Sequence, residues 1–437
     1  MQRSILLSLS LLSLAALAPA FAQADADRTD LARITPAHVD PALAGAHSDP
    51  FKPVYVVTSR QTHDAGLSTL ARNASARVAR SGAALVVSEL QTHQLTDLSR
   101  HVHEKERRCG GYFAFDSRAE AEAFVRDDRS AEAMTTAFAS YAIDNQATVT
   151  PWLGQVSEAN IRATIQSLSS NWPNRHASTS HGRNAATWVR DRWAALGNGR
   201  GDVSTELFNC SGCGSQPSVI LTIRGNELPN EVVVLGAHLD TISNSGSGET
   251  MRAPGADDDA SGIATLTEVL RIAMTNGYRP KRTIKLMGYA AEEIGLRGSK
   301  AIAADFKARG VNMVGVLQLD MTNYRTSTAP DVRVINDFSN AGLQQLLRDL
   351  FATYLGGSLR LGSYTCNYGC SDHASWTAAG YPAAMYFEGG NANGGYSPYI
   401  HTANDTLASV GQSAQASVPF AKLGLAFLGE VGKTAGR

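Results

Sequence analysis

The chain has 437 residues, which is long for one domain, since a domain usually contains about 100–200 residues. Lys and Arg together number 39 and Asp and Glu number 40, so the formal net charge is −1, without a basic stripe or an acidic tail. This composition predicts two folded units and gives no support for binding to nucleic acid or to bulk membrane.

The first 22 residues have the pattern of a secretory signal. Arg3 precedes a short apolar core, and the small residues Ala20 and Ala22 follow it with Ala-x-Ala spacing. A membrane anchor is the less favoured alternative, because the apolar core is shorter than the roughly 20 residues that a span needs. We therefore expect cleavage after Ala22 and secretion from the cell, with a periplasmic stage in transit as an alternative.

Five cysteines fit an oxidising destination. Two residues separate Cys210 from Cys213, and three separate Cys366 from Cys370, so two local disulfides are favoured. A zinc site built from these four thiolates is the alternative. Cys109 is left over, and its role stays open.

The region after the signal predicts a small α/β unit. Residues 23–50 are linker-like, and strands are expected at 54–57, 84–87 and 112–115, with helices at 67–79, 96–106 and 118–125. We interpret three histidines on polar segments as solvated side chains, namely His93, His101 and His103. Residues 127–147 predict a junction exposed to proteolysis. We therefore interpret residues 23–142 as a removable pro-domain with its linker.

Residues 143–437 predict a second, longer α/β domain. Strands are expected at 219–224, 232–236, 283–289, 314–319, 332–335 and 383–387. Helices are expected at 158–169, 182–195, 261–277, 297–309, 340–354, 373–379 and from 417 onward. This alternation is typical of a doubly wound, mostly parallel sheet with helices on both faces.

Acidic residues and histidines follow several of these strands, at the sheet edge where open α/β folds place ligands. They are His238, Asp257, Asp258, Asp259, Glu292, Glu293 and Asp320, and a later loop adds His401. Converging carboxylates raise each other's pKa unless a cation is bound. Histidines with carboxylates and no thiolate predict zinc, with cobalt or manganese as alternatives, rather than calcium or magnesium. Residues 257–259 would bridge two ions, although an aspartate before a helix is often an N-cap, and these patterns do not select one of the three.

Six motifs in this domain resemble those of the secreted bacterial leucyl aminopeptidases that contain two zinc ions. They are Gly-Ala-His-Leu-Asp at 236–240, the acidic turn at 255–262, and the segments 290–299, 317–324, 366–373 and 400–402. The motifs stand in family order, and the match covers residues 143–437. The resemblance implies a fold of the zinc exopeptidase type.

The resemblance also implies two Zn²⁺ ions per chain, with five ligands: His238, Asp258, Glu293, Asp320 and His401. It places His238 and Asp320 on one ion, Glu293 and His401 on the other, and Asp258 between them. Glu292 would be the general base for a water activated by both metals. Tyr368 would donate a hydrogen bond to the oxyanion, with a half-buried packing role as the alternative. Asp240 is placed to orient His238.

An apolar pocket for the first residue of the substrate follows from the same resemblance, lined by Met321, Ile335, Met385, Phe387, Tyr396 and Ile400. We expect a secreted aminopeptidase that releases leucine-like or other hydrophobic residues from peptides with a free N-terminus. The pro-domain would act on it as an intramolecular inhibitor or folding aid. A hydrolase or cyclising transferase with one working zinc and a catalytically inactive binding protein are the alternatives. The complete set of ligands with Glu292 disfavours both.

Overall fold

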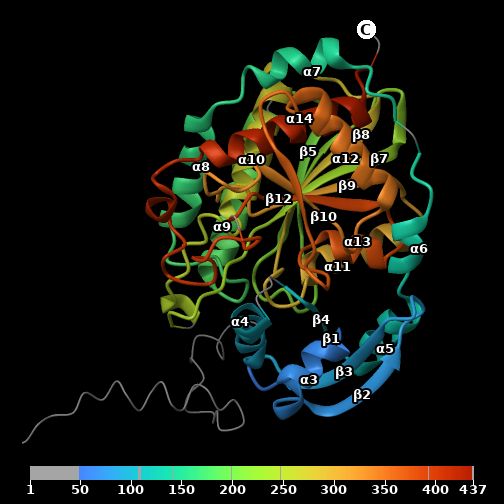
Figure 1. Ribbon diagram of the computed structural model, residues 1–437, viewed down its shortest axis with the longest axis vertical. Coiled ribbons are helices and arrows are strands. Elements are labelled where there is room, and N and C mark those ends of the chain that lie inside the picture. The colour runs from blue at the N-terminus through green and yellow to red at the C-terminus, as the bar shows by residue number, and fades with distance from the viewer. Residues whose placement is uncertain are drawn as a thin grey trace, which may run out of the picture. The chain divides into compact units, whose positions relative to one another are not determined.

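The computed structural model describes residues 49–106, 110–139, 141–197, 199–246, 248–391 and 393–435. The predicted signal at 1–22, the predicted linker before residue 49, and Cys109 lie outside these residues. The described chain forms a four-stranded sheet followed by an eight-stranded sheet (Figure 1). Each sheet has its own helices.

The N-terminal sheet is antiparallel, with the strand order β2-β3-β1-β4. Its strands are β1 (Pro53–Ser59), β2 (Arg72–Val78), β3 (Ala84–Gln91) and β4 (Tyr112–Phe115). Its helices are α3 (Arg60–Ala65), the short η3 (Leu67–Thr69), α4 (Gln94–Glu106) and α5 (Arg118–Asp127). The three predicted strands and the helices at 96–106 and 118–125 are confirmed.

The predicted helix at 67–79 is wrong, because most of this stretch is the edge strand β2. Arg72 pairs with Glu89 and Val78 with Ala84, with an irregular register between Arg72 and Ser75. All of the β2 side chains are exposed or half-buried, so the segment carries no apolar periodicity of its own. Pairing with β3 therefore decides its conformation, and its arginines suit a sheet edge that faces solvent.

The predicted junction at 127–147 contains two helical segments, α6 (Ser130–Thr135) and the beginning of α7 (Gln146–Leu153). Between them, the described residues of 136–145 form no helix or strand, and several are exposed. The segment ends at a fixed point, because the Glu430 carboxylate accepts hydrogen bonds from the backbone N–H groups of Asp144 and Asn145 at 3.0 Å. The C-terminal helix thus holds the start of the larger domain.

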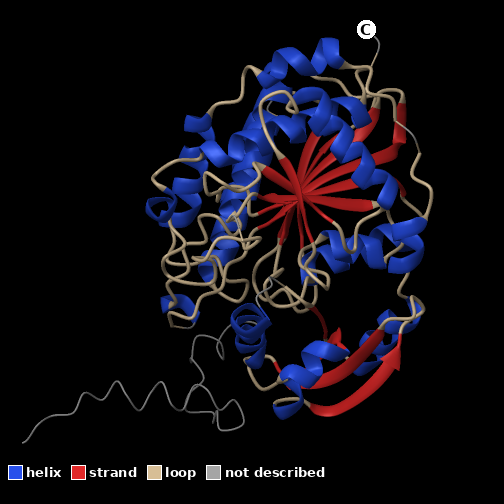
Figure 2. Ribbon diagram, in the orientation of Figure 1, coloured by secondary structure: helices blue, strands red, loops and turns tan. Residues whose placement is uncertain are grey.

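The larger sheet is mixed and mostly parallel, with the order β11-β10-β12-β9-β7-β8-β6-β5. Figure 2 shows its strands in red among the blue helices of the same domain. Its strands are β5 (Val203–Phe208), β6 (Ser218–Ile223), β7 (Leu228–His238), β8 (Arg282–Tyr289), β9 (Asn312–Asp320), β10 (Val332–Ile335), β11 (Leu361–Tyr364) and β12 (Ala383–Glu388). The central strands β12, β9, β7 and β8 are parallel, whereas β6 and β10 run antiparallel to their inner neighbours. The six predicted strands are confirmed, and the edge strands β5 and β11 were not predicted.

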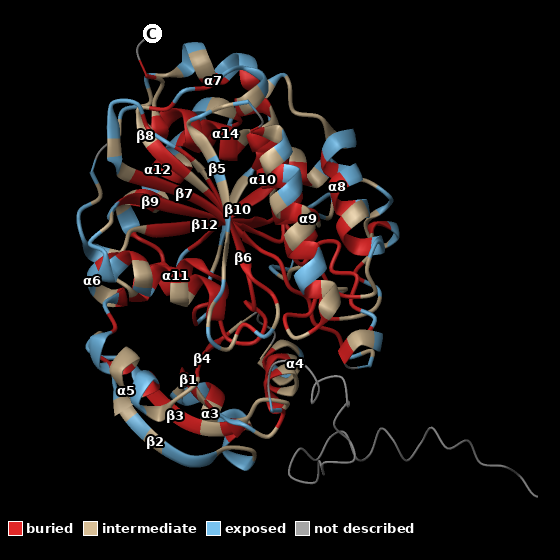
Figure 3. Cartoon of the chain, turned by 180° about the vertical axis from the view of Figure 1, so that it is seen from behind, coloured by how far each residue is buried: buried red, intermediate tan, exposed pale blue. Residues whose placement is uncertain are grey.

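Helices cover both faces of this sheet, as predicted. On β7, Val233 and Leu235 pack with the face covered by α8 (Glu158–Ser170), α9 (Ser180–Leu196), α10 (Ala260–Thr275), α12 (Ala341–Tyr354) and α14 (Val418–Gly432). Val232 and Val234 pack with the face covered by α11 (Arg297–Ala308) and α13 (His373–Ala378). Short helices lie at η4 (Gly248–Thr250), η5 (Leu407–Val410) and η6 (Gln415–Ser417). The central strands are therefore buried on both faces (Figure 3).

Two apolar clusters join the N-terminal domain to the larger one. The first combines Val56, Leu95, Leu98 and Val102 with Ala291 and Ile294, among others. The second combines Val57, Phe113 and Phe115 with Leu296, Tyr368 and Ala374. Since buried residues of both domains share each cluster, separating the domains would expose apolar surface to water.

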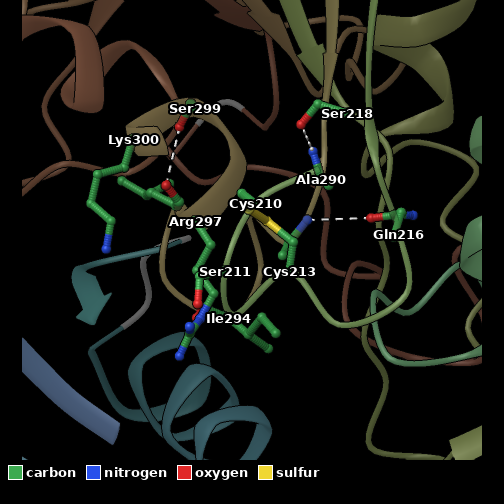
Figure 4. Close-up of a disulfide and its surroundings, with 12 residues drawn as sticks. Cys210, Ser211, Cys213, Gln216, Ser218, Ala290, Ile294, Arg297, Ser299 and Lys300 are labelled. Atoms are coloured by element: carbon green, nitrogen blue, oxygen red, sulfur yellow. Dashed lines mark hydrogen bonds between the residues drawn. A yellow bond between two sulfur atoms is a disulfide. The ribbon is translucent and has the colours of Figure 1, made fainter. Parts of the chain in front are cut away.

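Cys210 pairs with Cys213 and Cys366 pairs with Cys370, as their spacing predicts. These sulfurs are therefore not available as zinc ligands. Figure 4 shows the Cys210–Cys213 disulfide close to Ser211, Ile294 and Arg297. Arg297 also reaches the N-terminal domain, with its Nη1 atom 3.1 Å from Asp116 Oδ1. Among the helices that the structure describes, none is long and apolar enough to cross a membrane.

Candidate metal centre

The five residues predicted to bind metal lie together at the carboxyl ends of the central strands. His238 is the last residue of β7 and Asp320 the last of β9, while Glu293 follows β8. Asp258 lies just before α10, and His401 lies in the loop after β12. All five side chains are buried. The fold thus gathers groups that are up to 163 positions apart, from His238 to His401.

The five side chains form two overlapping groups, and Asp258 belongs to both. His238 Nε2 lies 2.9 Å from Asp258 Oδ1 and 3.6 Å from Asp320 Oδ1. His401 Nε2 lies 3.1 Å from Asp258 Oδ2 and 2.8 Å from Glu293 Oε2. Within each group the candidate ligand atoms lie within 4.8 Å of one another. Asp258 therefore presents one oxygen to each group, which is the arrangement of a bridging ligand.

These donors fit divalent metal ions. Asp320 Oδ1 and Glu293 Oε1 are buried and accept no hydrogen bond from the residues that the structure describes. A buried carboxylate oxygen without a partner costs free energy, and a cation would remove that cost. Imidazole nitrogens together with carboxylate oxygens are typical zinc donors. The donor set is thus consistent with one divalent ion in each group.

The structure separates the three adjacent aspartates. Asp259 caps α10, accepting a hydrogen bond from Gly262 N at 2.9 Å, and it also accepts from His238 N and Met321 N at 3.0 and 3.1 Å. Asp257 accepts from Asn323 N at 2.8 Å. Of the three, Asp258 is the one that faces both histidines. The N-cap alternative therefore describes Asp259, while metal binding by Asp258 stays a prediction.

Four side chains of the larger domain, which we call the supporting residues, hold the candidate ligands through buried hydrogen bonds. They are Asp240, Asp259, Ser371 and Asp405. The Asp240 carboxylate accepts from Glu292 N at 2.9 Å and Glu293 N at 3.1 Å, and its Oδ1 atom lies 3.5 Å from His238 Nδ1. Ser371 donates to Asp320 Oδ2 at 2.6 Å. Asp405 accepts from the backbone of Asp257 and Asp258 at 2.9 and 3.0 Å.

Sequence reasoning named Asp240 and left Ser371 and Asp405 without a role. Ser371 lies inside the motif at 366–373, so the resemblance of this motif to the family was a sequence signal for Ser371. Asp405 lies four positions after His401 in an irregular loop, and nothing in the sequence distinguishes it from other loop aspartates.

Burial and nearby charges oppose each other in this cluster. Burial raises the pKa of Asp258, but His238 and His401 outweigh it, so this pKa lies below its ordinary value. Burial raises the pKa of Glu293 to about 7 and that of Glu292 well above its ordinary value, although His238 acts in the opposite direction on Glu292. A bound cation would lower the pKa of both glutamates. An ionised Glu292 could then accept a proton as a base.

The six residues of the predicted pocket meet in one apolar cluster. Met321, Ile335, Met385, Phe387 and Ile400 form it together with Cys366 and Cys370, and Tyr364 and Tyr396 pack against it. The structure therefore adds Tyr364 and a disulfide to the cluster that the predicted pocket residues form. A role of this cluster in substrate selection stays a prediction.

Tyr368 lies against the N-terminal domain in this structure. Its Oη atom is 3.4 Å from the carbonyl oxygen of Val57, and its ring packs against Phe113 and Phe338 with centroid distances of 6.2 and 5.5 Å. The side chain is 4% exposed. This position fits the packing role of Tyr368 directly. It fits the oxyanion role only after the contact between Tyr368 and Val57 is broken.

The prediction that His103 is a solvated side chain is wrong. Its ring centroid lies 4.7 Å from that of His401, and its Nδ1 atom lies 3.3 Å from Tyr396 Oη. Burial lowers the pKa of His103 to about 3, and the charge of His401 acts in the same direction. A histidine on a polar helix gives no sequence signal for such a contact, because the contact forms only when two domains pack together.

Four groups of the N-terminal domain, which we call the covering residues, contact this region: Val57, Ser99, His103 and Tyr112. Ser99 donates a hydrogen bond to the carbonyl oxygen of Glu293, and Tyr112 Oη lies 3.4 Å from the same oxygen. Ser99 and Tyr112 are also hydrogen-bonded to each other, at 2.7 Å. The N-terminal domain thus reaches the backbone of a candidate ligand as well as the ring of His401.

Comparison with known proteins places this arrangement in a family. Residues 218–421 match the model of peptidase family M28. Leucine aminopeptidase 1 of Ajellomyces capsulatus (strain H88) is 34% identical over 326 residues, which cover 71% of this chain and 82% of the relative. The chain belongs to peptidase family M28. This M28 chain is a metallo-aminopeptidase of the leucine aminopeptidase type, as predicted.

Solved structures extend the likeness to the N-terminal domain. LapB from Legionella pneumophila matches with a TM-score of 0.72 and 27% identity, over 87% of this M28 chain and 100% of LapB. The LapA aminopeptidase of the same organism matches with a TM-score of 0.72 and 25% identity, over 88% and 99% of the two chains. The two structures match 87% and 88% of this chain, which is more than residues 143–437 contain. The matches therefore include residues of the N-terminal domain.

Proposed function

We propose that this M28 enzyme binds two Zn²⁺ ions and releases the first residue of peptides when that residue is leucine-like or otherwise hydrophobic. The observation that carries the proposal is Asp258, which presents one oxygen to each of two groups of buried ligands. Relatives named as leucine aminopeptidases support the substrate class.

In the proposed mechanism His238 and Asp320 would hold one ion, Glu293 and His401 would hold the other, and Asp258 would contribute to both. When bound, the ions supply Lewis acidity, which lowers the pKa of a water and polarises a peptide carbonyl. Glu292 accepts the proton of the attacking water and returns it to the leaving amine. Asp240 fixes the backbone of Glu292, so the base is positioned before substrate binds. The Tyr368 hydroxyl donates a hydrogen bond to the oxyanion after this hydroxyl has moved away from the carbonyl oxygen of Val57.

The apolar cluster around Met321, Ile335 and Met385 would receive the first side chain of the peptide. The carboxylates of the metal site would attract the free α-amino group, which accounts for action at the N-terminus. Burial of an aliphatic side chain contributes about 1.5–3 kcal/mol. A leucine-like residue therefore has an advantage over a small or polar one.

The proposal also includes secretion and a bacterial type of enzyme, with residues 23–142 as a pro-domain that inhibits the enzyme or assists its folding. The signal-like pattern at 1–22 and the two disulfides support an exported protein. The likeness to the two Legionella proteins supports the bacterial type. The two apolar clusters shared by the domains support a pro-domain that acts through contact.

The test is hydrolysis of leucyl 4-nitroanilide by protein freed of the N-terminal domain, before and after treatment with a chelator and after zinc is returned. We expect the chelator to abolish the activity and zinc to restore it, with two zinc ions per chain by elemental analysis. Protein that holds two zinc ions and lacks the N-terminal domain, yet hydrolyses no N-terminal residue from any aminoacyl amide, would contradict the proposal.

A further inference from the structure

We propose that the ring of His103 occupies the entrance to the substrate site, so that helix α4 competes directly with the first residue of a peptide. The inference rests on the proposed function, whose site it regulates.

The ring of His103 lies beside both a candidate metal ligand and a predicted pocket residue. The His103 ring lies against the ring of His401, a candidate metal ligand, with a centroid distance of 4.7 Å and an interplanar angle of 55°. It also lies 5.7 Å from the ring of Tyr396 and hydrogen-bonds the hydroxyl of that tyrosine at 3.3 Å. Tyr396 packs against Phe387 of the pocket cluster at 6.4 Å. The ring thus lies between the ligands that would receive the α-amino group and the pocket that would receive the side chain.

Helix α4 is held in this position by apolar packing and by a hydrogen bond. Leu95, Leu98 and Val102 are buried in the cluster that contains Ala291 and Ile294. Ser99 precedes His103 by four residues, so the two side chains lie on the same face of the helix. Ser99 donates to the carbonyl oxygen of Glu293, which directs that face toward the metal site. Movement of His103 alone is therefore limited to side-chain rotation.

His103 contacts groups that the proposed reaction uses. A half-buried histidine at a domain interface is often a packing residue, and such a residue would touch neighbours without a role in the chemistry. His103 instead touches a candidate metal ligand and a predicted pocket residue. A peptide and the His103 ring therefore exclude each other, and the inhibition is competitive.

The experiment uses the uncut chain with zinc and compares the wild type with His103→Ala in the hydrolysis of leucyl 4-nitroanilide. We expect the apparent KM of His103→Ala to fall about tenfold with little change in kcat, because an internal competitor reduces the fraction of molecules open to substrate. Glu104→Ala is the matched control, since Glu104 is exposed on the same helix, and it should behave as the wild type. His103→Phe retains a ring and should remain inhibited.

Digestion of the N-terminal domain in all four proteins separates the possible outcomes. Equal activities after digestion would show that the substitutions leave the larger domain intact. If digestion activates the wild type but uncut His103→Ala keeps the wild-type KM, the inference is wrong. The same holds if His103→Phe is as active as His103→Ala, since a ring would then not be the obstacle. Absence of activity in every digested, zinc-loaded protein would contradict the proposed function instead.

Discussion

The metal site has two sets of neighbours, and they come from different domains. The supporting residues belong to the larger domain and hold the candidate ligands through hydrogen bonds of 2.6–3.1 Å. The covering residues belong to the N-terminal domain and contact the same region from their own sheet and helix. The supporting residues thus position the ligands from within the larger domain, and control of access by the covering residues is the proposal made above. Changes in the first set should reduce catalysis or metal affinity, and changes in the second should alter access or domain association.

The largest effect is expected at Glu292, whose backbone a supporting residue holds. Glu292→Gln keeps the shape of the side chain and removes the base, so kcat should fall about 10³-fold. The zinc content, measured by elemental analysis, should equal that of the wild type, because Glu292 is not among the candidate ligands. Near-normal turnover in the fully metallated variant would remove Glu292 from the mechanism.

Asp240→Ala tests a supporting residue directly. Loss of its carboxylate frees His238 and the backbone of Glu292 and Glu293, so zinc affinity should fall about 10–100-fold. Competition with a chromophoric chelator measures this affinity. Asp349→Ala, at an exposed position on α12, is the control and should bind zinc as the wild type does. Equal affinities in both variants would show that Asp240 does not position the metal ligands.

A cut between the domains tests how the covering residues are held in place. The described residues of 136–145 include the exposed Ala137, Ala139, Ala142 and Asp144. We expect the two fragments to stay together after cleavage there, because the two shared apolar clusters remain buried. Size-exclusion chromatography should show the two fragments as one complex. In the hydrolysis of leucyl 4-nitroanilide, the apparent KM of this complex should equal that of the uncut chain. Free fragments at micromolar concentration would mean that the covalent link holds the domains together.

An effect on stability rather than on catalysis is expected at Asp116, which pairs with Ser211 and the 4% exposed Arg297. Ser211 and Arg297 lie beside the Cys210–Cys213 disulfide (Figure 4). Asp116→Ala should lower the free energy of unfolding by about 2 kcal/mol in urea titrations. Asp127→Ala, with 65% of its side chain exposed, is the control and should change it little.

The effect of Asp116 should also depend on pH. Burial raises the pKa of Asp116, but Ser211 and Arg297 outweigh burial and lower it below the ordinary value of 3.8. A carboxyl whose folded-state pKa is lowered stabilises the fold fully above its unfolded pKa and loses this contribution as pH falls through the lower value. The difference between the wild type and Asp116→Ala should therefore shrink below pH 3.8. A difference that stays constant down to full protonation would show that the charge is not the cause.

The larger domain was predictable because its signals are local. Buried runs such as 232–236 mark strands, and acidic groups at strand ends mark the sheet edge where ligands gather. The edge strands β5 and β11 lack such runs: none of their residues is fully buried. The choice of Asp258 over its neighbours required the resemblance, because all three aspartates stand before the same helix.

The N-terminal domain was less predictable because its decisive features are tertiary. Strand β2 exists through its pairing with β3, and its own residues carry no apolar period. His103 looked like a solvated residue because α4 is polar, yet its environment comes from His401, almost 300 positions later in the chain. Sequence patterns report which residues are apolar, and they do not report which domain packs on a polar helix.

The hydrogen bonds between Glu430 and the N–H groups of Asp144 and Asn145 have a consequence for the ends of a processed chain. Wherever the linker is first cut, exopeptidases will reach Phe138, Tyr141 and Ile143, which pack on the core of the larger domain, and then Asp144 and Asn145, whose backbone is hydrogen-bonded to α14. Successive trimming of ragged ends should therefore slow at the same place in every molecule. A uniform N-terminus near residue 144 would then reflect where the backbone is held rather than the specificity of the enzyme that made the first cut.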